Sequence, residues 1–374
     1  MKRVTRKRVI LAAAILAALA GAFAAFWHLG GWRLFDPYAG RAFNLDVKIP
    51  TGYEVVFEGV SKAVSEKAKA GPIWKRLTKK VSESETHSII KIVTITPQAG
   101  SDWELMGVLT KHSCPKSAGG IPLTQAYVFR RDLEGRPVSR LKDDLQAPLP
   151  SLALCVREHE EMPYSAGKIT DEPREVGETW SAVKHVENLN RRTDYRHKFQ
   201  LVRIREREGN LCALVEFTTE WKIGSNGQMG TATSAKGEQR GEYLFDLKRG
   251  VSLSNKSSGE SRIVDSSGTE RLSQYKLTTR LSSYRELSPD EIEIYRRRLT
   301  AIDQVLVEAA AGNGEEAIKL LTELMADETS SDWRTGLQHT LDMLKSAVAK
   351  EAAQASSDAR GKKEEESSKV QEDR

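Results

Sequence analysis

The chain is short of cysteine, and it lacks the brief motifs that mark common enzymes. Only Cys114, Cys155 and Cys212 occur among 374 residues, and no pair of them has the spacing of a metal site. The sequence has no Walker-type phosphate loop, no dinucleotide fingerprint, no His-Glu-x-x-His motif and no nucleophile elbow. We therefore expect no enzymatic activity, no bound metal and no cofactor.

A few weak candidates for chemistry each have a simpler interpretation. Ser113–Lys116 matches the Ser-x-x-Lys pattern of serine acylases, but its internal proline disfavours the helix that presents the serine. Glu158–Glu161, with His159, resembles a metal site, but adjacent residues of a strand point to opposite faces, so we expect a solvated charged loop. Asp132 and Asp246 occupy matching places in two hairpins, where we expect turn residues that cap backbone N–H groups rather than an acid pair. The cysteines fit either small buried residues or one disulfide with one free thiol.

The net charge is small and is concentrated at the N-terminus. The chain has a formal charge of +5, and the five cations before Val9 account for all of it. Elsewhere cations and carboxylates are interspersed, as in Arg203–Glu208. A nucleic-acid-binding protein would cluster its cations on the folded part, so we expect no nucleic-acid partner. The five N-terminal cations are Lys2, Arg3, Arg6, Lys7 and Arg8.

An apolar run without charge or proline extends from Val9 to Trp27, directly after these cations. A basic flank before an apolar segment of roughly 20 residues is typical of a signal anchor whose basic end stays in the cytoplasm. We therefore expect a cytoplasmic segment at 1–8, a transmembrane helix at 9–29, and a single-pass cell-membrane protein whose bulk is extracytoplasmic, in the periplasm. Cleavage as a signal peptide near Ala20–Ala22 is the alternative. The first cysteine lies too far along the chain for lipid attachment.

The pattern after a connector at 30–44 predicts a mainly β protein. The clearest strand is Leu211–Ile223, with mostly apolar residues on one parity and mostly polar residues on the other. A turn that contains Gly209 joins it to the preceding strand. We expect a Gly/Ser-rich loop at 224–241 and then a hairpin whose turn includes Gly250. This order favours an antiparallel meander over βαβ units.

The first half of the β region faintly repeats in the second. Tyr127–Gly135 resembles Tyr243–Gly250, because each is an aromatic-rich strand that runs into a charged turn closed by glycine. We expect two similar β units, at 45–146 and 174–286, joined by a linker at 147–173. Chance resemblance is the alternative, and the sequence leaves open whether the two units form one continuous sheet.

The period changes from two to that of a helix at Leu287. Ser288–Glu291 has the features of a helix start, with serine as N-cap, proline in the first turn and a glutamate that reaches back. An apolar stripe follows over 292–309, and further helices are expected through 317–344. We therefore predict a helical hairpin or bundle at 287–350 and a disordered charged tail at 351–374. The stripe consists of Ile292, Tyr295, Leu299, Ile302, Leu306 and Ala309.

Three stretches of the second half resemble a β-rich domain of unknown function that recurs in bacterial envelope proteins. Val176–Trp180 is similar to its Val-x-Gly-Asp-x-Trp opening, Phe199–Phe217 to its paired strands, and Gly241–Gly250 to its Gly-x-x-x-Phe-Asp-x-x-x-Gly hairpin. The resemblance implies a curved antiparallel sheet, similar in outline to half-barrels that carry lipoproteins or lipids, and it implies no catalytic residue. Many relatives are lipoproteins, whereas this chain lacks the lipid-attachment cysteine, so the anchor is its only tether.

Two functions remain in competition. In the first, the curved sheet is a non-catalytic binding module for an apolar ligand or an envelope protein, and its ligand-binding residues are Phe217, Trp221, Tyr243 and Phe245. In the second, the protein is a structural or assembly protein whose C-terminal helices contact an envelope partner. The first predicts an apolar cavity on the sheet, and the second predicts an exposed apolar stripe on residues 292–309 or 317–344.

Overall fold

A computed structural model describes most of the chain beyond the N-terminal region. The described residues are 37–38, 40–45, 49–68, 80–98, 100–113, 123–133, 136–141, 151–160, 170, 172–188, 191–224, 232–265 and 269–372. The expected transmembrane helix at 9–29 and Cys114 lie outside these ranges. Within them, no helix combines the length and the apolar character needed to span a membrane.

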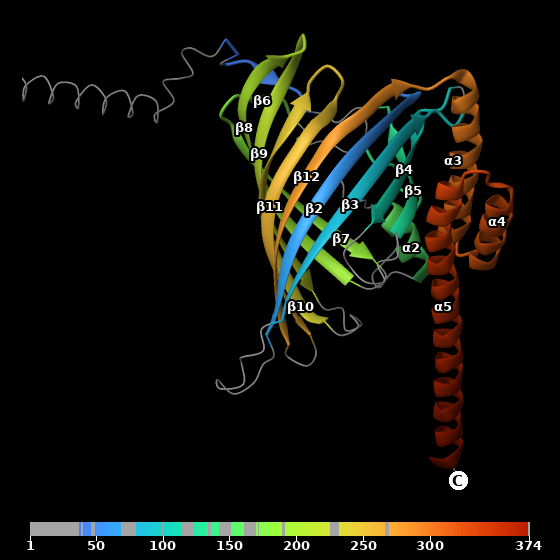
Figure 1. Ribbon diagram of the computed structural model, residues 1–374. Coiled ribbons are helices and arrows are strands. Elements are labelled where there is room, and N and C mark those ends of the chain that lie inside the picture. The colour runs from blue at the N-terminus through green and yellow to red at the C-terminus, as the bar shows by residue number, and fades with distance from the viewer. Residues whose placement is uncertain are drawn as a thin grey trace, which may run out of the picture.

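The two expected β units form a single antiparallel sheet of ten strands (Figure 1). Its spatial order is β5-β4-β3-β2-β12-β11-β10-β9-β8-β7, so β2 and β12 pair and join the two meanders. The first meander is β2 (Tyr53–Ala68), β3 (Lys80–Ile95), β4 (Trp103–Ser113) and β5 (Leu123–Asp132). The second is β7 (Thr179–Asn188), β8 (Arg191–Arg207), β9 (Asn210–Gly224), β10 (Ala232–Asp246), β11 (Val251–Asp265) and β12 (Glu270–Glu286). Two short strands, β1 (Ala42–Phe43) and β6 (Arg174–Glu175), pair separately.

The hairpin turns follow from residues that tolerate positive φ. Glu208 and Gly209 have φ of 52° and 74° and form the two-residue turn between β8 and β9, as the primed hairpin turns require. Gly250, with φ of 65°, closes the turn between β10 and β11. The predicted strand at Leu211–Ile223 and both predicted turns are confirmed.

The prediction of a loop over 224–241 is wrong for its second half, which belongs to β10, because this strand begins at Ala232. A Cβ on Gly237 would lie 2.5 Å from the ring of Trp221, and one on Gly241 would lie 2.9 Å from the ring of Phe217. These glycines therefore make room for aromatic rings of β9 and for the close backbone of β11, a use of glycine inside a sheet that differs from a turn.

Four helices accompany the sheet among the described residues. α2 (Ser151–Glu160) lies within the segment expected to be only a linker, so that expectation is corrected. α3 (Pro289–Ala310) begins with the predicted capping box of Ser288 and Glu291. α4 (Gly314–Asp327) and α5 (Ser331–Glu372) follow. α5 continues through the expected disordered tail and extends away from the sheet (Figure 1); Ala, Glu and Lys, all strong helix formers, are frequent there.

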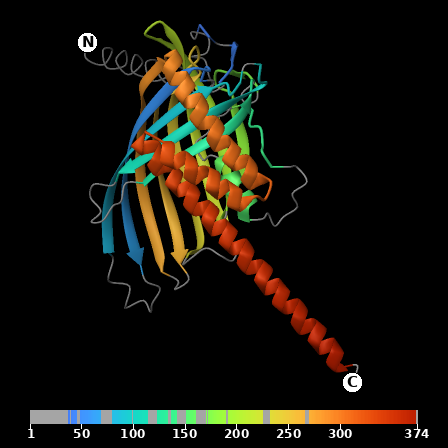
Figure 2. The same cartoon turned by 90° about the vertical axis from the view of Figure 1, so that its right-hand side faces the viewer.

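The helices α3 and α5 cover one face of β3, β4 and β5 (Figure 2). A buried cluster joins Leu105 and Val128 of the strands to Leu299 and Leu337 of the helices. The approach is close, because a Cβ on Gly107 would lie 2.5 Å from the side chain of Leu299. Burial of the helical stripes against the sheet thus follows from the apolar spacing in the sequence.

The sheet curls so far that its two edges approach one another. α2 contacts both edge strands, β5 and β7. Leu45 belongs to a buried cluster with Leu201 and Ile204 of β8, whereas the carbonyl of Ile49 accepts a hydrogen bond from Arg131 of β5. Four residues of chain span at most about 14 Å, so the face that this segment touches lines the inside of the curl. We call it the inner face, and the opposite, helix-bearing face the outer face.

Candidate functional site

The four predicted ligand-binding residues lie on the inner face of β9 and β10, but in different surroundings. Phe245 is fully buried, and Phe217 is buried with its ring stacked on that of Tyr243 at 4.5 Å between centroids. Burial raises the pKa of Tyr243 to about 12. Trp221 lies further along β9 and is only half-buried. Phe217, Tyr243 and Phe245 therefore contribute to packing, and ligand binding by the four residues stays a prediction.

The inner face of seven adjacent strands carries no Asp, Glu, Lys or Arg over its middle part. Many of its side chains are nevertheless only half-buried, including Tyr195, Trp221, Tyr275 and Leu277. Aromatic, aliphatic, hydroxyl and amide groups replace charge there. The inner-face positions concerned are alternate residues of 193–201 on β8, 215–223 on β9, 235–243 on β10, 255–263 on β11, 273–279 on β12, 59–65 on β2 and 82–88 on β3.

A ladder of stacked rings follows β8 on this face. Tyr195 stacks on His197 at 5.8 Å, His197 on Phe199 at 5.7 Å, and Phe199 on Trp180 of β7 at 5.5 Å between ring centroids. Burial, assisted by the charge of Lys184, lowers the pKa of His197, so its imidazole is neutral at pH 7. Nδ1 of His197 is hydrogen-bonded to Thr219 at 2.9 Å. The rings of the ladder therefore add no charge to the inner face, although Lys184 of β7 lies opposite Tyr195 at its edge.

Polar groups of the inner face mostly satisfy one another. The hydroxyls of Ser65 and Ser273 are 2.7 Å apart, and Nε2 of Gln239 donates to the hydroxyl of Ser257 at 2.8 Å. The exceptions among the described residues are the hydroxyls of Thr94 and Thr110 and the side-chain oxygen of Asn255, which are buried and have no hydrogen-bond partner. A buried carbonyl oxygen without a donor is uncommon in native proteins, and it offers an acceptor to a bound molecule.

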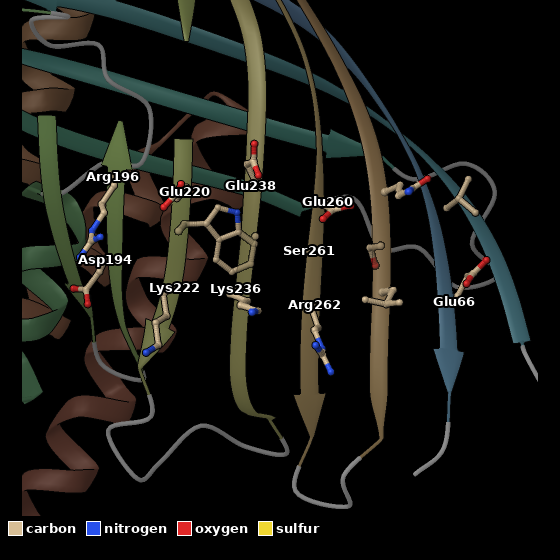
Figure 3. A pocket seen from close by; sticks show the side chains of 16 residues that line it. Glu66, Asp194, Arg196, Glu220, Lys222, Lys236, Glu238, Glu260, Ser261 and Arg262 are labelled. Atoms are coloured by element: carbon tan, nitrogen blue, oxygen red, sulfur yellow. The ribbon is translucent and has the colours of Figure 1, made fainter. Parts of the chain in front are cut away.

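The outer face of the same strands is densely charged and holds a groove of about 890 Å³ (Figure 3). The groove extends over β8, β9, β10, β11, β12 and β2. Charged side chains from alternate positions of these strands dominate its lining, among them Arg196, Glu220 and Arg262. Over these positions the inner face is uncharged, whereas the outer face is densely charged.

The two aspartates that the sequence offered as a candidate acid pair cap the turns of their hairpins. Oδ1 of Asp246 accepts hydrogen bonds from the backbone N–H groups of Lys248 and Arg249, and Asp132 accepts one from Arg136, so the predicted capping role is confirmed.

Cys155 and Cys212 are buried and form no disulfide among the described residues, and burial raises the pKa of the Cys212 thiol, which disfavours the reactive thiolate. Among the described residues, no group of three or more His, Cys, Asp and Glu side chains is placed to hold a metal ion. Residues 158–160 belong to α2 rather than to a loop, and Cys114–Lys116 lie outside the described part of the chain.

The uncharged inner face can be predicted from the sequence only in part. The alternation on β9 was visible, because its apolar parity is nearly continuous. On β11, β12 and β2 the inner parity consists of Ser, Thr, Gly and Asn with single apolar residues, which are also typical of loops. A signal was still present, since charge is confined to the other parity of each strand over 255–263, 273–279 and 59–65.

Comparisons with known proteins do not place the chain in a family. No family model and no curated protein matches it. Solved structures with some similarity include a mutant form of Rh. blastica porin, which is 9% identical, with 60% of this chain and 99% of that chain covered and a TM-score of 0.24. Lipovitellin is also 9% identical, with 64% and 26% covered and a TM-score of 0.30. Scores this low carry no argument about fold or function, and they give no support to a likeness with lipoprotein carriers.

Proposed function

We propose that this protein is a non-catalytic binding module, tethered to the cell membrane by its N-terminal segment, that holds an uncharged and largely apolar ligand against the inner face of its sheet. The observation that supports this is the absence of charge from a half-exposed face, in a chain in which 29% of the residues are charged. A face that met only water would carry charge as freely as the outer face does. Uncharged, concave surfaces rich in aromatic groups are typical of ligand sites.

The ligand's place on this face follows from the burial of the side chains. Phe217 and Phe245 are buried in the core, so they pack beneath the ligand site and do not contact the ligand themselves. Trp221 and Tyr275 are half-buried, hydrogen-bonded to one another, and available to contact a ligand. The unpartnered oxygen of Asn255 supplies an acceptor for a donor group of that ligand.

The alternative, an assembly protein that uses its C-terminal helices, has less support. It calls for an exposed apolar stripe on residues 292–309 or 317–344. Leu299, Leu306 and Leu321 are fully buried, and so are Leu337 and Leu344. These side chains pack against the sheet and against one another, and are not available to a partner.

Two adjacent threonines of β12 allow a matched test. Thr279 lies on the inner face and Thr278 on the outer face. The full chain is purified in a mild detergent after exposure to an envelope lipid extract, and native mass spectrometry measures the retained small molecules. We expect wild type and the Thr278→Asp variant to retain the same mass, and the Thr279→Asp variant to lose most of it, because a carboxylate on the inner face repels an apolar ligand.

Unfolding temperatures of both variants separate lost binding from lost folding. A wild-type protein that retains no small molecule, or a folded Thr279→Asp variant that retains as much as wild type, contradicts the proposed function. If Thr279→Asp does not fold, Thr279→Val and Asn255→Leu give the same comparison, with loss of retained ligand expected only for Asn255→Leu.

A further inference from the structure

The charges of the outer-face groove are ordered in rows that run across the strands. Glu220, Glu238 and Glu260 are direct neighbours on β9, β10 and β11, since Glu220 pairs with Glu238 and Glu238 with Glu260. A row of cations lies beside the row of glutamates, two residues away from it on each strand. It consists of Lys222, Lys236 and Arg262, and Lys236 pairs with both of the others. Figure 3 shows the two rows one below the other. Their spacing is about 6.7 Å, the rise of two residues in a strand.

The fold does not require this order. Like charges directly opposite one another on neighbouring strands are destabilising. An exchange of Lys236 and Glu238 within β10 would turn four like-charged contacts into four opposite ones, without a change in composition or net charge. The sequence keeps the like-charged order inside the rows, and opposite charges around them compensate in part. Glu238 pairs with Arg240 at 2.5 Å and Arg262 with Glu270 at 2.7 Å, while Arg196 and Asp194 of β8 lie opposite Glu220 and Lys222.

We propose that the groove binds a zwitterionic phosphate ester, with its phosphate on the row of cations and its ammonium on the row of carboxylates. Phosphoethanolamine carries its ammonium two carbons from its phosphate ester, so one molecule reaches both rows. Arg262 pairs with Glu270 at 2.7 Å, and its guanidinium presents further donors that suit a phosphate. The two lysines add point charges. The three glutamates accept hydrogen bonds from the ammonium. A purely anionic or purely cationic ligand would meet one row of its own sign.

This inference does not rest on the proposed inner-face ligand, because the charged side chains of the two rows belong to the outer face, although Trp221 borders the groove as well. The chemistry is common to a lipid headgroup and to a soluble ester, and the source is decided by experiment. The probe is glycerophosphoethanolamine, titrated by calorimetry into the full chain in maltoside micelles. We expect it to bind at least tenfold more tightly than glycerol phosphate or ethanolamine.

The exchange of rows within β10 gives the sharpest test. The Lys236→Glu/Glu238→Lys variant should unfold at a temperature no lower than that of wild type, and it should lose glycerophosphoethanolamine binding by at least tenfold. The control exchanges an exposed ion pair outside the groove, Glu58 and Arg280, and should bind as wild type does. Equal binding by the β10 variant, or equal affinity for the three probes, overturns the proposal.

A second arm identifies the source. In nanodiscs of phosphatidylethanolamine, bilayer headgroups that occupy the groove would compete with the soluble probe and weaken its apparent affinity. An affinity equal to that in micelles assigns the groove to a soluble ester. If the β10 exchange prevents folding, the single variants Glu238→Gln and Lys236→Gln replace it, and each should weaken binding severalfold.

Discussion

The hydroxyl of Tyr295 donates a hydrogen bond to the carboxylate of Glu54 across 3.1 Å, and so joins α3 to a buried charge on β2. Lys91 and Arg285 also contact this carboxylate, each at 3.0 Å. Glu54 is only 4% exposed, so the three donors replace the water that a carboxylate would otherwise hold. The hydrogen bond of Tyr295 thereby links α3 to the sheet.

We expect the Tyr295→Phe variant to lose about 1–3 kcal/mol of unfolding free energy, because it removes a hydrogen bond to a charged group and leaves the packing of the ring unchanged. Urea unfolding at pH 7 measures the difference. Tyr53→Phe is the control, since Tyr53 lies next to Glu54 in sequence and faces the other side of the sheet. A loss as large in the control would show that the effect does not come from Glu54.

The stability of the protein should fall in acid through the same carboxylate. Burial opposes ionisation of Glu54, but hydrogen bonds and charge from Lys91, with the charge of Arg285, outweigh it and lower its pKa. Because the pKa of Glu54 is lower in the folded than in the unfolded protein, its ionised carboxylate stabilises the fold. This stabilisation is complete above the unfolded-state pKa of about 4.3, and it is lost as pH falls through the folded-state pKa.

Unfolding free energies measured from pH 7 down to pH 3 should therefore decline, and the decline should be smaller in Glu54→Gln. The pKa of Glu328 is lowered in the same way, because hydrogen bonds from Arg298 outweigh its burial, so part of the decline should persist. A pH dependence identical in wild type and Glu54→Gln would contradict the assignment.

Asp303 of α3 accepts hydrogen bonds from two arginines, and its replacement should lower the free energy of unfolding. Its carboxylate accepts hydrogen bonds from Arg130 of β5 at 2.6 and 2.8 Å and from Arg140 at 2.8 Å. The Arg140 side chain is fully buried, so Asp303→Asn leaves a buried cation uncompensated. We expect a loss of about 3–5 kcal/mol in urea unfolding. Glu316→Gln breaks an exposed pair with Lys319 and should cost less than about 1 kcal/mol; similar losses in both variants would refute the distinction.

The sequence was sufficient for elements whose signal is local. The capping box at Ser288 and the turn at Gly209 are determined by a few adjacent residues, and both were predicted. The strand at Ala232–Gly241 is not apparent from the sequence, because its glycines are explained by close contacts with Trp221 and Phe217 of β9 and with the backbone of β11. The pairing of β2 with β12 depends on contacts between residues more than 200 positions apart, which no local pattern contains. The charge rows were missed for the same reason, since they exist only once the register is known.

Phe217 and Trp221 lie four residues apart on the inner face of β9, and their truncation should distinguish core from ligand site. Phe217 is 5% exposed and stacks on Tyr243, so Phe217→Ala should cost about 3–5 kcal/mol of unfolding free energy. Trp221 is half-buried above Gly237. Trp221→Ala should therefore cost clearly less stability, yet it should lose more of the retained inner-face ligand than Thr278→Asp does. Urea unfolding and native mass spectrometry of both variants give the comparison. If Phe217→Ala proves as mild as Trp221→Ala, then Phe217 borders open space, and the ligand site extends further toward Tyr243 than the packing indicates.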